Sequence, residues 1–148
     1  MSKFGLSLLG VLLAVVASGP VLADRTEDRE AIEALMWRYA RALDTGNAEA
    51  YAALYTNDGE FKAGNLSMKG KQALFDFVEG LGGPLGVYHM TADTFIEFVD
   101  DTHAIHHSYW LTMNRESGAV VDVGVSADQV VKVDGEWLIK VRDVDADH

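Results

Sequence analysis

The side chains best suited to chemistry in this sequence are its histidines, three of which lie close together at His103, His106 and His107. An imidazole with an ordinary pKa of about 6.5 exchanges protons near neutral pH and also binds metal ions. The segment alternates like a β-strand, so successive side chains point to opposite faces. His103 and His107 therefore point one way and His106 the other. This geometry argues against a shared zinc ion, and no metal site is predicted.

Other catalytic motifs are absent from the sequence. It has no G-x-S-x-G nucleophile motif, no phosphate-binding loop, no dinucleotide glycine pattern and no cysteine. The paired acids at residues 100–101 fall in a predicted turn, where solvation accounts for them. We therefore expect no bound cofactor.

Helices are predicted in the first half of the chain. A single helical stripe with a period of 3.6 residues is formed by Ile32, Leu35, Met36, Tyr39 and Leu43. The sequence D-T-G-N at residues 44–47 is expected to end this helix, because Gly46 can take a positive φ and Asn47 can cap the next helix. Shorter helices are predicted over residues 48–55 and 71–79.

Strands are predicted mainly in the second half. A turn at residues 57–59 precedes a short strand at 60–62, and from Val87 onward the apolar pattern alternates with period two. Turn signals near residues 100, 117 and 134 divide this part into four antiparallel strands. Helices at the start and strands at the end favour an α+β fold, in which helices pack on one face of a curved antiparallel sheet.

Parts of the sequence resemble a known family. Residues 31–61, AIEALMWRYARALDTGNAEAYAALYTNDGEF, resemble the opening of the SnoaL-like branch of the nuclear transport factor 2-like, or cystatin-like, superfamily. Two later segments, YHMTADTFIEFVDDTHAIHHSYW and KVDGEWLIK, resemble sheet segments of the same branch. The resemblance implies a cone: a bent sheet wraps around the first helix and leaves a central pocket open at one end.

The resemblance also implies site residues. In relatives similar to scytalone dehydratase and to the lindane dehydrochlorinase, an aspartate at the end of the first helix and a histidine early in the sheet form a catalytic pair, which matches Asp44 and His89 here. The dehydratase pattern has a second histidine further along the sheet, and Asn114 falls near that position in the alignment. The dehydrochlorinase pattern has an arginine in its last strand, which Arg142 matches. The implied substrate pocket comprises Tyr39, Phe61, His106, Ser108, Trp110, Asn114 and Arg142.

Such a pair abstracts a proton. His89 is the base, and Asp44, bonded to the other ring nitrogen, fixes the tautomer and stabilises the imidazolium. The first hypothesis is therefore a cofactor-independent dehydratase-type or isomerase-type enzyme that acts on a small, fairly apolar molecule. The alternatives are a non-catalytic exported module that binds a small ligand or dimerises, and a structural domain whose sheet face binds another protein.

Structural roles are open for both residues at this stage. Asp44 follows Arg41 by three residues in a turn sequence, which suits an ion pair or a turn. Strand alternation places His89 opposite Met90 and Ala92. Either the pocket face is polar there, or a bulge shifts the register, or His89 faces solvent.

The start of the chain predicts export. Lys3 precedes an apolar run over residues 4–17, and a small-residue ending at Ala23 follows, which is the order of a signal peptide. We expect cleavage after Ala23, so that residues 24–148 form a single domain in the periplasm or outside the cell.

Composition limits the partners of that domain. The whole chain has a formal net charge of −11, which disfavours nucleic acid and stable association with membranes. A small molecule is the expected partner. The family resemblance adds a homodimer formed through the outer face of the sheet.

Overall fold

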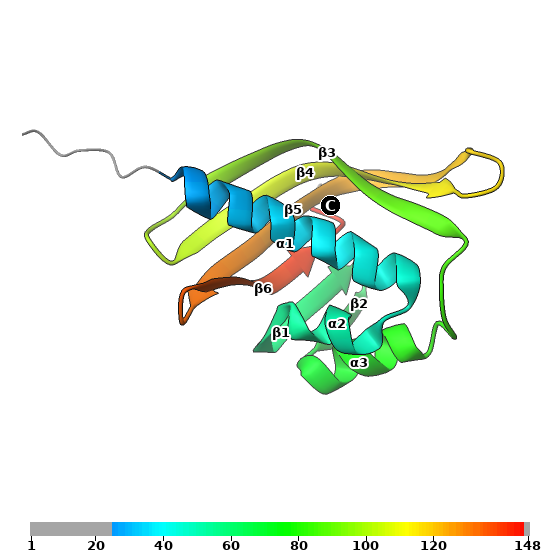
Figure 1. Cartoon of the computed structure of the whole chain (residues 1–148), viewed down its shortest axis with the longest axis horizontal. Coiled ribbons are helices and arrows are strands. Elements are labelled where there is room, and N and C mark those ends of the chain that lie inside the picture. Colours follow the sequence, from blue (N-terminus) through cyan, green and yellow to red (C-terminus); the bar gives the residue numbers. More distant parts are fainter. Residues whose placement is uncertain (1–24, 147–148) are drawn as a thin grey trace, which may run out of the picture.

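Helices lead the chain and long strands follow in the structure, a computed structural model that describes residues 25–146 (Figure 1). The predicted signal peptide at residues 1–23 lies outside this range. The elements are α1 (Thr26–Thr45), α2 (Ala48–Ala53), β1 (Tyr55–Ala63), β2 (Leu66–Lys69), α3 (Lys71–Glu79), β3 (Val87–Phe98), β4 (His103–Asn114), β5 (Val120–Val133) and β6 (Glu136–Asp143). None of the described helices is both long and apolar enough to span a membrane.

A single curved sheet organises these strands in the order β2-β1-β6-β5-β4-β3. Strands β3 to β6 form an antiparallel meander, as predicted. Strand β1 returns to pair in parallel with β6 and antiparallel with β2. Helix α1 lies along one face of the meander, and α2 and α3 lie beside β1 (Figure 1). The predicted α+β architecture is confirmed.

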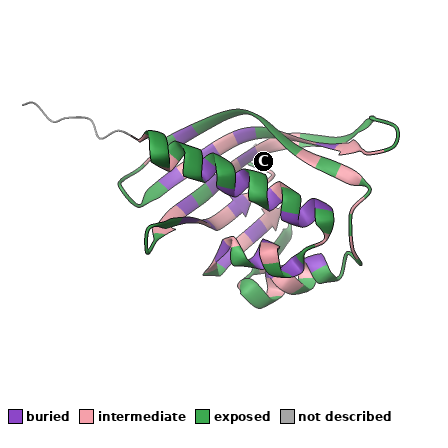
Figure 2. Cartoon of the chain, in the orientation of Figure 1, coloured by how far each residue is buried: buried purple, intermediate pink, exposed green. Residues whose placement is uncertain are grey.

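The core lies between α1 and the inner face of the sheet. The stripe on α1 is buried as predicted, with Ile32 and Leu35 fully inaccessible to solvent, while the opposite side of the helix is exposed (Figure 2). Ile139 of β6 is equally buried. Each such aliphatic side chain contributes about 1.5–3 kcal/mol by leaving water.

Two local predictions around β1 are wrong. The sequence Asn57-Asp58-Gly59 lies inside β1 and is not a turn between a helix and a strand, and α2 ends at Ala53. The pairing of β1 with β6 shifts register between Tyr55 and Glu60, so the turn-forming residues make a bulge instead.

A bulge in β3 determines which face of the sheet the His89 side chain points to. Pairing with β4 skips a residue between Ala92 and Phe95, and Asp93 within the skip has a φ of 49°. His89 and the buried Ile96 are an odd number of residues apart, so a regular strand would place them on opposite faces. The bulge lets both face inward.

The C-terminal end of α1 is held by Gly46, whose φ is 65°. The N–H groups of Gly46 and Asn47 donate to the carbonyls of Leu43 and Ala42 at 3.1 and 2.9 Å, which closes the helix in a Schellman motif. A Cβ at position 46 would lie 2.5 Å from the backbone of Gly83. The segment after α3 therefore packs directly against the end of α1.

Replacing Gly46→Ala is expected to lower the free energy of unfolding by about 2–4 kcal/mol, because it adds a positive-φ penalty to a collision with backbone. Gly118→Ala is the matched control, since Gly118 has a φ of 70° and open space around it. Its cost should be about 1–2 kcal/mol. Urea denaturation measures both, and equal losses would contradict the close packing at Gly46.

Candidate functional site

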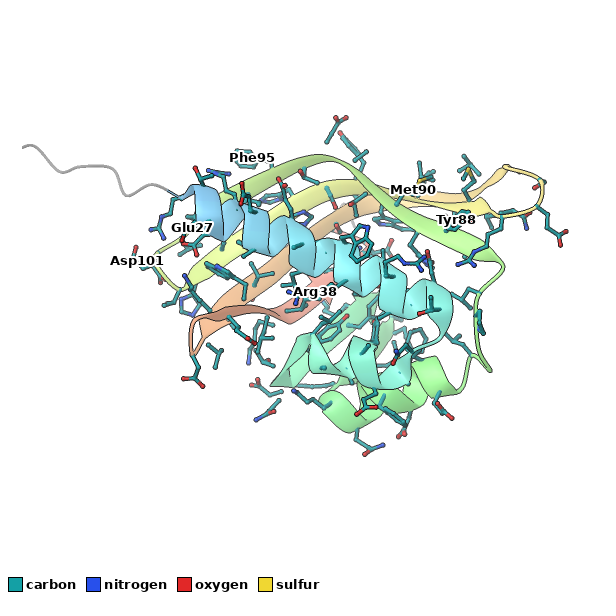
Figure 3. All side chains as sticks on the ribbon, viewed as in Figure 1. Glu27, Arg38, Tyr88, Met90, Phe95 and Asp101 are labelled. Atoms are coloured by element: carbon teal, nitrogen blue, oxygen red, sulfur yellow. The ribbon has the colours of Figure 1, made fainter. Side chains whose placement is uncertain are left out.

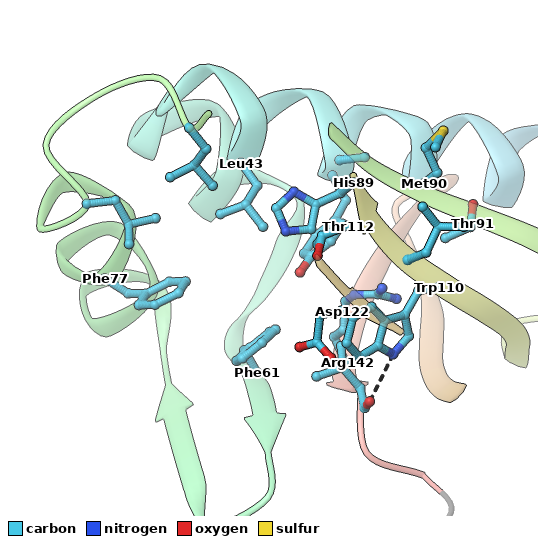
Figure 4. Close-up of a pocket in the computed structure, with 16 residues that line it drawn as sticks. Leu43, Phe61, Phe77, His89, Met90, Thr91, Trp110, Thr112, Asp122 and Arg142 are labelled. Carbon is cyan, nitrogen blue, oxygen red and sulfur yellow. Dashed lines mark hydrogen bonds between the residues drawn. The ribbon is translucent and has the colours of Figure 1, made fainter. Parts of the chain in front are cut away.

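A cavity of about 250 Å³ opens on the inner face of the sheet, between the second half of α1, helix α3 and strands β1 and β3 to β6 (Figure 4). Its walls are largely apolar and include Leu43, Phe61, Phe77 and Trp110. Small-molecule sites commonly measure about 300–1,000 Å³, so this cavity lies just below that range and suits a small ligand.

The pocket residues expected from the family resemblance divide into two groups. Four of them line the cavity: Tyr39, Phe61, Trp110 and Arg142. The other three, His106, Ser108 and Asn114, are outside the lining.

The reason is their position along β4. His106 and Ser108 share a face with Trp110, but they lie in the closed part of the core and are almost inaccessible to solvent. Asn114 ends the strand, and its Oδ1 accepts hydrogen bonds from the backbone N–H groups of Glu116 and Ser117 at 3.0 and 2.9 Å. It stabilises the turn toward β5.

The structure brings Asp44 and His89 together at the edge of the cavity. Asp44 Oδ1 lies 2.7 Å from His89 Nδ1, and the backbone N–H of His89 donates to the same carboxylate at 3.1 and 3.3 Å. An ionised carboxylate only accepts hydrogen bonds, so the proton of the neutral ring is held on Nδ1. Nε2 is then the nitrogen with a free lone pair, and His89 lines the cavity.

The surroundings of Asp44 are unusual for a carboxylate. It is only 2 % exposed and lies in the last turn of α1, where the helix dipole disfavours negative charge. The donors from His89 compensate for this location. Arg115 adds a cation 3.9 Å from Oδ2 and donates to the backbone carbonyl of Asp44 at 3.2 Å. No pattern in the sequence indicated Arg115, which lies in the turn after β4.

Arg142 lines the cavity and belongs to a buried polar cluster. Its guanidinium forms an ion pair with Asp128 and lies 4.3 Å from the centre of the Tyr39 ring. His106 Nδ1 lies 3.3 Å from the same Asp128 oxygen. Burial, the largest single influence, lowers the pKa of Arg142, but Asp128 together with Tyr39 and Tyr55 outweighs it, and the pKa rises above its ordinary value. Arg142 is therefore a fixed, neutralised cation.

Asp122 is a further polar residue of the lining that sequence reasoning missed. The available signal was a lone acid in the apolar segment V-V-D-V at residues 120–123. Within residues 25–146, no group of three or more acidic or histidine side chains is arranged to hold a metal ion.

Comparisons with known proteins agree with this fold. A family model described as a SnoaL-like domain matches residues 24–143. A protein of unknown function with a cystatin-like fold from Nostoc punctiforme is 25% identical, with a TM-score of 0.75 over 81% of this chain and 91% of that one. A candidate scytalone dehydratase from Novosphingobium aromaticivorans is 32% identical, with a TM-score of 0.65 over 79% and 82% of the two chains.

A third structure contains a ligand. A protein from Catenulispora acidiphila in complex with S-DNPA is 25% identical, with a TM-score of 0.67 over 78% of this chain and 90% of that one. Among curated proteins, no relative matches the sequence.

The contact between Asp44 and His89 predicts a single neutral tautomer. Two-bond ¹H–¹⁵N NMR spectra at a pH where the ring is neutral should show the His89 proton on Nδ1, and Asp44→Asn should abolish this preference because an amide can donate or accept. Asp100→Asn, which alters the exposed partner of His103, should leave the His89 signals unchanged. A proton on Nε2 in the unaltered protein would contradict the assignment.

The buried ion pair predicts an asymmetric response to substitution. Asp128→Ala should lower the free energy of unfolding by about 3–5 kcal/mol, because it leaves the Arg142 charge without its partner in the core. Adding Arg142→Met should recover part of that loss. Asp58→Ala, which removes the partner of Lys140 at the surface, is the control and should change stability little. A double variant as unstable as the sum of its parts would refute the coupling.

Proposed function

The chain belongs to the SnoaL-like family with the cystatin-like fold, and on this premise we propose that it is a cofactor-independent lyase or isomerase in which His89 is the base. Family and neighbours support a small-molecule-binding or isomerase-type role. The main support for His89 as the base is the 2.7 Å contact between Asp44 and His89 beside an apolar cavity.

The proposed reaction starts with a C–H bond of the ligand next to Nε2 of His89. The Nε2 lone pair takes the proton, and the electron pair of the C–H bond forms a C=C bond. In an elimination the C–O bond of the leaving hydroxyl breaks, the oxygen takes the electron pair of that bond and receives the proton from the imidazolium, and water is released. In an isomerisation the electron pair passes into an adjacent carbonyl, and the imidazolium returns the proton to another carbon.

The surroundings favour this chemistry in three ways. Asp44 stabilises the imidazolium that forms when His89 takes the proton. The apolar walls exclude water, which strengthens electrostatic interactions within the cavity. Arg142, whose charge is paired with Asp128, lines the wall with a guanidinium whose N–H groups can donate a hydrogen bond to a leaving oxygen.

We propose that the chain acts after export, once residues 1–23 have been removed. Mass spectrometry of the protein recovered from the producing cells tests this through the position of its N-terminus.

We also propose a homodimer through the outer sheet face, where Phe95, Tyr109 and Val123 are each about 60% exposed. Phe95 projects from β3 on the side away from α1 (Figure 3).

Replacing His89→Ala tests the proposed reaction. Small hydroxylated and carbonyl compounds are incubated with the protein in D₂O, and NMR follows C–H exchange and loss of water. The substitution should lower the rate for any compound turned over by about 10²–10⁴-fold, the usual contribution of a general base.

His103→Ala is the matched control for this experiment. His103 also pairs with an aspartate, Asp100, at 3.0 Å, but it is exposed and outside the cavity lining. Its substitution should leave the rate unchanged. An equal rate in His89→Ala would refute the role of His89. Ligand binding without any turnover would instead support a non-catalytic binding module.

A further inference from the structure

Asp122 belongs to a row of polar side chains that crosses three strands. In the sheet register His89 of β3 is opposite Thr112 of β4, and Thr112 is opposite Asp122 of β5. Directly opposed residues place their side chains on the same face of a sheet. All three line the cavity, and Figure 4 draws them in the group that surrounds it. The row is thus a polar band across a largely apolar wall.

The carboxylate of Asp122 has acceptor capacity to spare. Its one side-chain hydrogen bond within residues 25–146 is to the backbone N–H of Val123, at 2.9 Å from Oδ1. No cation of the described residues forms an ion pair with it. An ionised carboxylate accepts about four hydrogen bonds and donates none. Asp122 can therefore accept a donor from a molecule in the cavity.

Asp122 also sets the sign of the charge at the cavity. Arg142 is neutralised by Asp128, and Asp44 is compensated by the donors of His89 and by Arg115. Asp122 is then the charge in the lining without a counterpart among the described residues. A carboxylate or phosphate on a ligand would be repelled at this position, whereas an O–H donor would be attracted.

The distance between His89 and Asp122 lets the two side chains contact opposite ends of one ligand. Neighbouring strands lie ~4.8 Å apart, so the backbones of His89 and Asp122 are roughly 10 Å apart with Thr112 between them. A ligand of one or two fused rings can contact both side chains within a cavity of about 250 Å³. One end of such a ligand meets the free nitrogen of His89, and the other end meets Asp122.

We infer that Asp122 is a ligand-orienting residue that selects small, uncharged, mainly apolar molecules carrying a hydroxyl group opposite the position next to His89. This inference deepens the proposed function, since it names the substrate class of the same site. It concerns binding, and it holds whether or not His89 catalyses a reaction.

Three fluorescent probes of similar size test the inference: 2-naphthol, 2-methoxynaphthalene and 2-naphthoate. Fluorescence titration of the purified protein should show that 2-naphthol binds about tenfold more tightly than 2-methoxynaphthalene, which lacks the donor. 2-Naphthoate should bind most weakly because of its charge. Tightest binding of 2-naphthoate, equal binding of the two uncharged probes, or no binding of any probe would overturn the inference.

Substitution assigns the preference to Asp122. In Asp122→Leu the difference between 2-naphthol and 2-methoxynaphthalene should disappear, and in Asp122→Asn it should shrink, because an amide oxygen is a weaker acceptor than a carboxylate. Glu33→Leu removes one exposed negative charge from α1 and should keep the full preference. Melting temperatures should stay within about 2 °C of the unaltered protein, since the side chain at position 122 is exposed.

The outcomes also separate this inference from the proposed function. A preference for 2-naphthol that survives in Asp122→Leu would overturn the role of Asp122, even if His89→Ala abolishes turnover. A preference that depends on Asp122 would stand even if no compound is turned over. In His89→Ala the preference should persist, because the hydroxyl meets the opposite end of the polar row.

Discussion

A buried carboxylate at the wrong end of a helix is the constraint on which this site depends. Asp44 lies in the last turn of α1, where the helix dipole opposes its charge and water is excluded. It is tolerable there because β3 supplies the backbone N–H and the ring of His89, and the turn after β4 supplies Arg115. The same contacts that satisfy the carboxylate orient the imidazole. The stability of the fold and the orientation of His89 are therefore coupled at this point.

Irregular backbone makes that meeting possible. The Schellman motif at Gly46 ends α1 at Thr45, one residue after Asp44, and the absence of a side chain at Gly46 lets the segment at Gly83 approach closely. The bulge at Asp93 then allows the first part of β3 to present His89 inward while the second part buries Ile96. The inward orientation of His89 beside Asp44 thus depends on these local departures from regular structure.

Charge is distributed unevenly around the cavity, and this shapes what it can bind. The cation of Arg142 forms a buried ion pair with Asp128. Its charge is therefore compensated, and it does not make the cavity attractive to anions. The carboxylates of Asp44 and Asp122 lie at different distances from solvent, one buried and one exposed. Apolar walls between them leave room for a small, uncharged molecule. The site is consistent with the range of small-molecule roles found on this fold.

The sequence by itself determined the architecture, because the 3.6-residue stripe on the first helix and the period-two strands each require one buried face. It also indicated Asp44, His89 and Arg142 through resemblance to a family. It did not determine where the core closes along β4, so His106, Ser108 and Asn114 were expected in the lining, and Asp122 was missed. Those positions depend on strand register, on the bulges in β1 and β3, and on which part of the sheet α1 covers. Only the tertiary structure decided them, because pairing between distant segments leaves no local periodic signal in the sequence.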